Sequence, residues 1–149
     1  MPEEIFPPAA QTPRSTVILI VEDNEEIGDS LRQIIDEETP YHSVVVSESS
    51  SAIEQAQQLH PCLLLLDYRL PDMNGLELYD RLQEVEETRG VPAIMMSANL
   101  PGEELQRRGI LPLRKPGNTG GVIRIITHAL ATFEEQHMHA SSPHECRAN

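Results

Sequence analysis

The sequence predicts an α/β fold with a doubly wound, five-stranded parallel sheet. Two observations lead to this prediction. Short aliphatic runs such as Val17–Val21 and Leu63–Leu66 alternate with segments whose apolar residues recur at three-to-four spacing. The runs are apolar at every position, as is typical of strands covered on both faces. Parallel strands need crossover connections, and the helical segments between the runs can supply them. The 149 residues, 39% of them hydrophobic, suffice for one domain.

In the first half of the chain, strand and helix signals alternate. Residues 1–15 contain four prolines and no apolar period, so we expect a flexible, extended N-terminal segment. A helix capped by Asn24 and closed by Pro40 follows the first strand. The units that follow are, in order, a strand at 43–47, a helix at 50–59 and a buried strand at 62–66.

The second half continues the alternation. A loop at 67–74 leads to a helix that begins after Gly75 and ends before Gly90 and Pro92. The helix at 101–108 lacks a broad apolar face, so we expect few contacts to hold it. The remaining elements are strands at 93–96 and 110–113 and an amphipathic helix at 121–135. We therefore expect a domain at 16–136 and a flexible tail at 137–149.

Charge and composition limit the classes of partner. Eleven Lys and Arg against 24 Asp and Glu give a net charge of −13, which repels nucleic acid and anionic lipid. No apolar run approaches the roughly 20 residues of a membrane helix, and no leader pattern begins the chain. The two cysteines, Cys62 and Cys146, lie in unlike contexts and predict no disulfide. We expect a cytoplasmic protein without direct nucleic-acid contact or membrane insertion.

Polar side chains follow four of the five predicted strands. Glu22 and Asp23 follow the first strand, Asp67 the third, Ser97 the fourth and Lys115 the fifth. Ligands of open parallel sheets bind outside the carboxyl ends of the strands, so these groups are expected to converge on one edge. Crowded carboxylates must be protonated, hydrogen-bonded or paired with a cation. Oxygen-only ligands favour a hard divalent ion such as Mg²⁺. One carboxylate is then free to act as a nucleophile toward a phosphoryl group held by the hydroxyl and the ammonium.

Four motifs in order along the chain resemble the receiver domain of bacterial two-component response regulators: VILIVEDN, LLLLDYRLPDMNG, MMSA and RKP. The resemblance extends over the predicted domain. It implies a flavodoxin-like (βα)5 receiver fold. It also implies that Asp67 is the phosphoacceptor. Mg²⁺ is then held by Glu22, Asp23, Asp67 and the main-chain carbonyl of Arg69.

The resemblance assigns two further residues and shows departures from the family. Ser97 takes the place of the hydroxyl residue that contacts the phosphoryl group, and Lys115 that of the family lysine before a proline that is usually cis. Three residues before this lysine the family usually has Tyr or Phe, where this chain has Pro112, and Gly117 replaces a frequent aromatic residue. The interval from Ser97 to Lys115 is about one helical turn shorter than we expect for the family. The chemistry is therefore expected to be intact and the signalling surface remodelled.

The resemblance implies a stand-alone receiver that accepts a phosphoryl group from a phosphohistidine of a sensor histidine kinase or histidine phosphotransfer protein. It would signal through a protein–protein surface to an unknown downstream protein. Such a domain is not a conventional enzyme, because it catalyses only its own Mg²⁺-dependent phosphorylation and dephosphorylation. A phosphate sink and an interaction-only receiver remain alternatives. A haloacid-dehalogenase-like phosphatase would need a second Asp where Arg69 stands.

Overall fold

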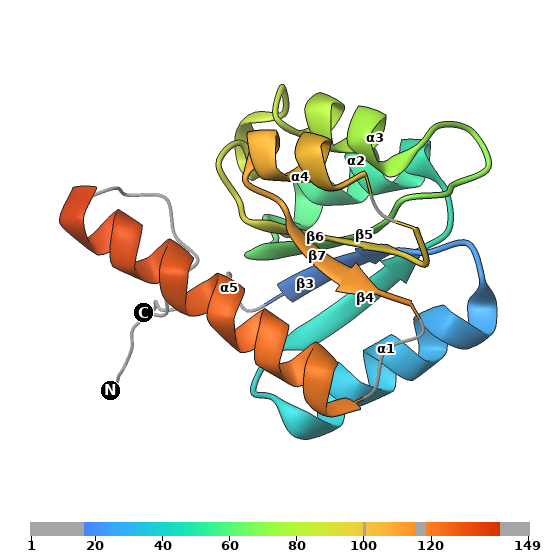
Figure 1. Cartoon of the computed structure of the whole chain (residues 1–149), viewed down its shortest axis with the longest axis horizontal. Coiled ribbons are helices and arrows are strands. Elements are labelled where there is room, and N and C mark those ends of the chain that lie inside the picture. Colours follow the sequence, from blue (N-terminus) through green and yellow to red (C-terminus); the bar gives the residue numbers. More distant parts are fainter. Residues whose placement is uncertain (1–16, 100, 116–118, 141–149) are drawn as a thin grey trace, which may run out of the picture.

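The sheet has the predicted architecture. A computed structural model describes residues 17–99, 101–115 and 119–140 (Figure 1). Its described strands form one five-stranded sheet in the order β4-β3-β5-β6-β7, and every neighbouring pair is parallel. This order is the flavodoxin-like one, so the predicted fold class is confirmed. The strands are β3 (Val17–Val21), β4 (His42–Val46), β5 (Leu63–Asp67), β6 (Ala93–Ser97) and β7 (Leu111–Arg114).

Helices cover both faces of the sheet. One face carries α1 (Glu25–Glu38) and α5 (Thr119–Ala140), and the other carries α2 (Ser49–Leu59), α3 (Gly75–Leu82) and α4 (Gly102–Arg108) (Figure 1). A short 3-10 helix, η2 (Glu86–Thr88), follows α3. None of the helices in the described ranges is long and apolar enough to cross a bilayer.

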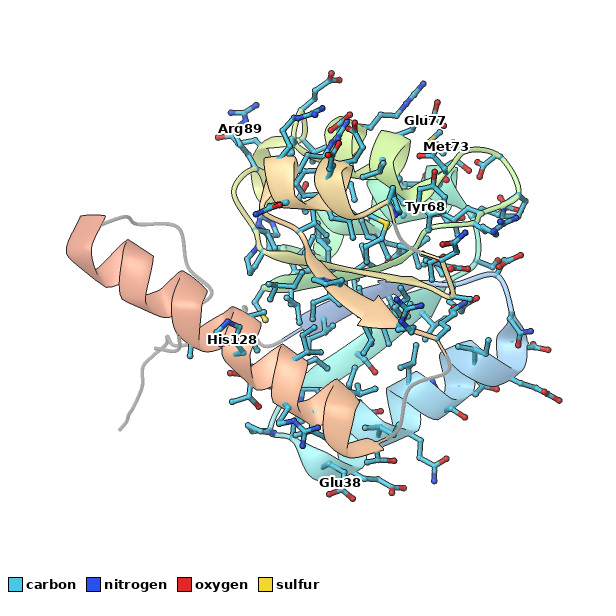
Figure 2. All side chains as sticks on the ribbon, viewed as in Figure 1. Glu38, Tyr68, Met73, Glu77, Arg89 and His128 are labelled. Atoms are coloured by element: carbon cyan, nitrogen blue, oxygen red, sulfur yellow. The ribbon has the colours of Figure 1, made fainter. Side chains whose placement is uncertain are left out.

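The two faces have separate aliphatic cores, which explains why the central strands are apolar at every position. In β3, Ile18 and Ile20 face the core under α1 and α5, whereas Leu19 and Val21 face the core under α2, α3 and α4. Figure 2 shows side chains filling the space between the sheet and the helices on each side. Strands β3, β5 and β6 are buried, and β4 and β7 form the half-exposed edges.

Helix starts follow from local sequence. The Asn24 side chain accepts a hydrogen bond of 3.1 Å from the Ile27 amide, so the predicted cap of α1 is confirmed. Asn74 and Glu77 form a reciprocal capping box at the start of α3, with bonds of 2.9 and 3.0 Å. These caps fix the direction in which each helix leaves the carboxyl edge of the sheet.

Two helix ends differ from the prediction. Helix α3 ends at Leu82, because the buried Thr88 hydroxyl donates a 2.6 Å hydrogen bond to the Leu82 carbonyl and the chain turns into η2. Helix α5 continues to Ala140, beyond the expected end at 135, because residues 136–140 contain neither Gly nor Pro. Residues 137–140 therefore belong to α5 and not to a tail. The N-terminal segment 1–15, residues 141–149, Pro116 and Gly117 lie outside the described residues.

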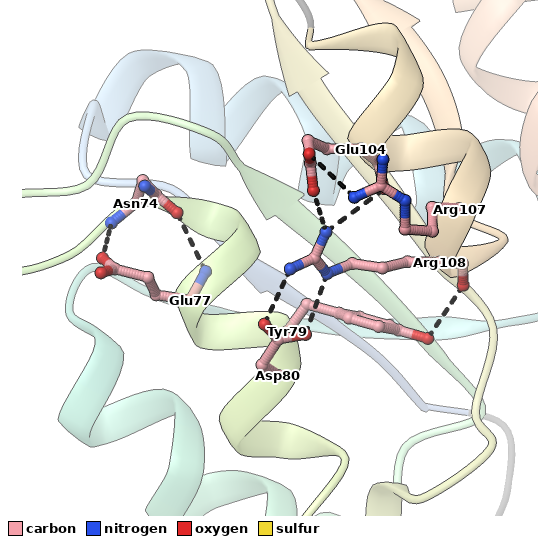
Figure 3. Close-up of polar contacts among 7 residues, drawn as sticks. All are labelled: Asn74, Glu77, Tyr79, Asp80, Glu104, Arg107 and Arg108. Carbon is pink, nitrogen blue, oxygen red and sulfur yellow. Dashed lines mark hydrogen bonds and ion pairs between the residues drawn. The ribbon is translucent and has the colours of Figure 1, made fainter.

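The helix at 101–108 buries one residue, as its lack of a broad apolar face predicts, but polar contacts that the sequence did not predict also hold it. Arg108 donates from Nε and Nη2 to the two carboxylate oxygens of Asp80 on α3, each at 2.9 Å. It also donates to Glu104 at 2.7 Å, and the Tyr79 hydroxyl donates to the Arg108 carbonyl at 3.4 Å (Figure 3). Leu105 adds a buried apolar contact. Helix α4 is thus attached to α3 mainly through polar groups, which apolar periodicity does not reveal.

Candidate functional site

Three acidic side chains meet at the carboxyl edge of the central strands. Val21 and Leu66 are register partners in β3 and β5, so the residues that follow them are neighbours. Glu22, Asp23 and Asp67 each offer a carboxylate oxygen, and these three atoms lie within 4.8 Å of one another. Glu22 and Asp67 are 2% and 4% exposed, whereas Asp23 is exposed to solvent. The structure therefore brings together the three predicted carboxylates.

Lys115 lies between the two buried carboxylates. Its Nζ is 2.9 Å from Glu22 Oε1 and donates a 3.1 Å hydrogen bond to Asp67 Oδ1. The Lys115 amide donates to the Ser97 carbonyl at 3.0 Å, which extends the pairing of β6 and β7 and fixes the lysine backbone at the sheet edge. The side chain can reach the acidic cluster because its backbone is held in this register.

The electrostatics of the site favour a charged Lys115 and disfavour ionisation of Glu22. Burial raises the pKa of the Glu22 carboxyl, and the charge of Asp67 acts in the same direction. Hydrogen bonds from Lys115 and from the Asn24 amide lower this pKa without cancelling the rise. For Lys115, burial lowers the pKa, but Glu22 and Asp67 outweigh it, so the ammonium pKa is raised above its usual value.

This cluster has the donor chemistry of a site for a hard divalent cation. Three carboxylates face one ammonium, which leaves an excess of negative charge in a mostly buried place. Carboxylate oxygens at a partly open edge are the ligands that Mg²⁺ prefers. Glu22, Asp23 and Asp67 therefore fit the ion that the resemblance implies.

The loop after Asp67 is held tightly. The Gly75 amide donates a 2.7 Å hydrogen bond to the Tyr68 carbonyl, and Arg69 forms an isolated antiparallel bridge with Asn74. A Cβ at Gly75 would lie 2.5 Å from Met95 Sδ and 2.7 Å from the Asp67 carbonyl oxygen, so only glycine fits. Arg69 itself is exposed in this loop, two residues after Asp67.

Ser97 ends β6 beside the acidic cluster but bonds to its own loop. Met96, the preceding residue, is the register partner of Asp67. The Ser97 hydroxyl accepts a 3.1 Å hydrogen bond from the Asn99 amide and donates at 3.2 Å to the Asn99 carbonyl. Ser97 is 4% exposed. The structure therefore places Ser97 at the expected edge with its hydroxyl turned toward the β6–α4 loop.

Sequence reasoning did not find two contacts near the site. The buried Ser49 hydroxyl donates a 2.9 Å hydrogen bond to Asp72 Oδ1, which ties the start of α2 to the loop after Asp67. Arg114 Nη1 donates a 3.0 Å hydrogen bond to the Ala98 carbonyl. The position of Arg114 directly before Lys115 was a usable signal, because it puts a second cation at the same strand end.

Known sequences include relatives of this chain. Residues 18–108, more than half of the chain, match the family model described as response regulator receiver domain, and the match ends before Lys115. The polar-differentiation response regulator DivK of Brucella ovis is 36% identical over 81 residues. That segment covers 54% of this chain and 65% of DivK, so the match spans just under two thirds of the relative.

Solved structures show the same fold over more of the chain. A CheY-like receiver domain protein from Methanospirillum hungatei is 26% identical, with a TM-score of 0.74, and the alignment covers 82% of this chain and 98% of that one. The receiver domain of NtrX from Brucella abortus is 26% identical, with a TM-score of 0.69 and coverages of 77% and 98%. Both alignments cover nearly the whole of the solved domain. Motifs, fold and family match agree, and this chain belongs to the response regulator receiver domain family.

Proposed function

We propose that the chain is a phosphorylation switch in which Asp67 accepts a phosphoryl group from a phosphohistidine. The donor is a sensor histidine kinase or a histidine phosphotransfer protein in the cytoplasm, and the product signals through a protein–protein surface. One observation carries the proposal. Asp67 is almost fully buried, shares its cluster with two more carboxylates, and accepts a hydrogen bond from the Lys115 ammonium.

The proposed reaction is a displacement at phosphorus. An Asp67 carboxylate oxygen forms a bond to phosphorus, the N–P bond of phosphohistidine breaks, and its electron pair returns to the imidazole ring. Lys115 balances the charge that the phosphoryl oxygens bring to the buried edge. Glu22, Asp23, Asp67 and the Arg69 carbonyl would hold Mg²⁺, which would supply positive charge to offset that of the phosphoryl oxygens. The Ser97 hydroxyl turns from Asn99 toward a phosphoryl oxygen, which requires the two bonds to Asn99 to break.

The arrangement suits one covalent event per chain better than turnover of a free substrate. Arg69 stands where a haloacid-dehalogenase-like phosphatase would need a second carboxylate, so no acid–base partner follows the nucleophile at that position. The product is an acyl phosphate on the protein itself. Its lifetime distinguishes a signalling switch from a phosphate sink.

Incubation with acetyl phosphate and Mg²⁺, followed by intact-mass spectrometry, tests the proposal. The wild-type chain should gain one phosphoryl group, and Asp67→Asn should gain none, because the amide is not a nucleophile. Asp29→Asn is the control, since Asp29 is an exposed carboxylate on α1 that pairs with Arg32 of the same helix at 3.3 Å. Undiminished incorporation in Asp67→Asn shows that a different group accepts the phosphoryl group and rejects the proposal.

A further inference from the structure

Pro112 removes the aromatic side chain that the family resemblance predicts on β7, but the same strand places another side chain on the β6–α4 loop. Ser97 and Arg114 are register partners in β6 and β7, so the backbone of Arg114 lies beside that of Ser97. Arg114 Nη1 then donates a 3.0 Å hydrogen bond to the carbonyl of Ala98. Strand β7 has no aromatic side chain at Pro112, but it contacts the β6–α4 loop through the guanidinium of Arg114.

The Arg114 bond and the Ser97 bond act on one peptide group. The Ala98 carbonyl and the Asn99 amide belong to the same planar unit. Arg114 binds the carbonyl side of this unit, and Ser97 Oγ accepts from its N–H at 3.1 Å. A cation at the carbonyl oxygen polarises the amide and strengthens its donation to Ser97. The two bonds therefore support each other and fix the orientation of the peptide.

We propose that Arg114 is a positioning residue that holds the Ala98–Asn99 peptide in the conformation that keeps the Ser97 hydroxyl away from Asp67. This inference rests on the proposed function of Asp67 as phosphoacceptor. The Ser97 hydroxyl must release Asn99 to reach a phosphoryl group, and movement of this peptide breaks the Arg114 bond as well. A contact made in one state and lost in the other stabilises the first state. Arg114 thus lowers the occupancy of the phosphoryl-binding conformation.

Binding of beryllofluoride in the presence of Mg²⁺ tests the proposal, with NMR detection of the Asn99 amide. Arg114→Met keeps the apolar stem and removes the donor, and we expect it to bind beryllofluoride about three to ten times more tightly than wild type. The amide resonance of Asn99 in the free variant should shift toward its position in the beryllofluoride-bound wild type. Loss of positive charge near an anion site would by itself weaken beryllofluoride binding. Tighter binding would therefore come from loss of the Arg114–Ala98 hydrogen bond and not from loss of charge.

Two further variants control for charge. Arg107→Met removes the same charge from α4, where Arg107 pairs with Glu104 in its own helix at 3.1 Å, and it should bind as wild type does. Arg114→Lys keeps the charge and replaces the guanidinium with an ammonium donor, and its beryllofluoride affinity should lie between those of wild type and Arg114→Met. Unchanged or weaker binding by Arg114→Met, or an unmoved Asn99 resonance, overturns the inference. Failure of the wild type itself to bind beryllofluoride overturns the proposed function instead.

Discussion

Asp23 is the exposed member of the acidic cluster, and its role can be separated from that of the nucleophile. Asp23→Asn should lower the Mg²⁺ affinity by about tenfold or more, because a charged oxygen ligand is lost while Asp67 stays in place. Isothermal titration calorimetry measures the change. Glu25→Gln, the same charge change in the first turn of α1, is the control and should have a much smaller effect. Equal losses of Mg²⁺ affinity in both variants would show that Asp23 attracts the ion only through its charge and does not bind it directly.

The sequence predicted which residues meet at the site but not how they are bonded. Glu22, Asp67 and Lys115 could be predicted because parallel strands in fixed register bring their carboxyl ends to one edge. The Ser97–Asn99 and Arg114–Ala98 bonds depend on side-chain rotamers and on the path of a short loop. Neither rotamers nor that path follow from strand order, so these contacts required the structure.

The attachment of α4 to α3 gives a prediction about pH. The Arg108 guanidinium holds the pKa of the Asp80 carboxyl below its usual value of 3.8. Because the folded pKa is depressed, the pair stabilises the fold above that usual value and its contribution is lost as pH falls through the folded pKa. At neutral pH, Asp80→Asn should lower the free energy of unfolding by about 0.5–1 kcal/mol. The effect is small because Asp80 is half exposed and solvent screens its charge. The difference should shrink as pH falls below about 4.

Urea denaturation of wild type and Asp80→Asn across this pH range measures the effect. Asp29→Asn breaks an exposed pair within a single helix and should change stability less at every pH. A pH-independent difference between Asp80→Asn and wild type would show that charge pairing with Arg108 does not cause it.

Element starts could be predicted better than element ends. Asn24 caps α1 through a bond to Ile27 three residues away, which local sequence reveals. The end of α3 depends on Thr88, whose hydroxyl binds the carbonyl of Leu82 in the last turn. That contact forms only when the chain has already turned into η2, so periodicity alone extended the helix too far.

In the whole molecule, we expect phosphorylation to change the structure mainly in the β6–α4 loop and α4. Amide hydrogen exchange with and without beryllofluoride and Mg²⁺ should change most in residues 98–109. At one end of this segment Asn99 bonds to Ser97, and at the other end Arg108 attaches α4 to α3. Strand β4, at the edge of the sheet opposite β7, should change little. Changes confined to α5 would contradict transmission through the β6–α4 loop and α4.

Pro112 also has a consequence for self-association. Strand β7 is an edge of the sheet, and the Lys115 amide faces β6, so alternation turns the backbone positions of Pro112 and Arg114 outward. Proline has no N–H to offer there, which costs the sheet no internal hydrogen bond. A foreign strand aligned along β7 would find a missing donor at the centre of a four-residue edge. The residue that rules out a swinging aromatic ring thus also protects the sheet from growing by edge-to-edge aggregation.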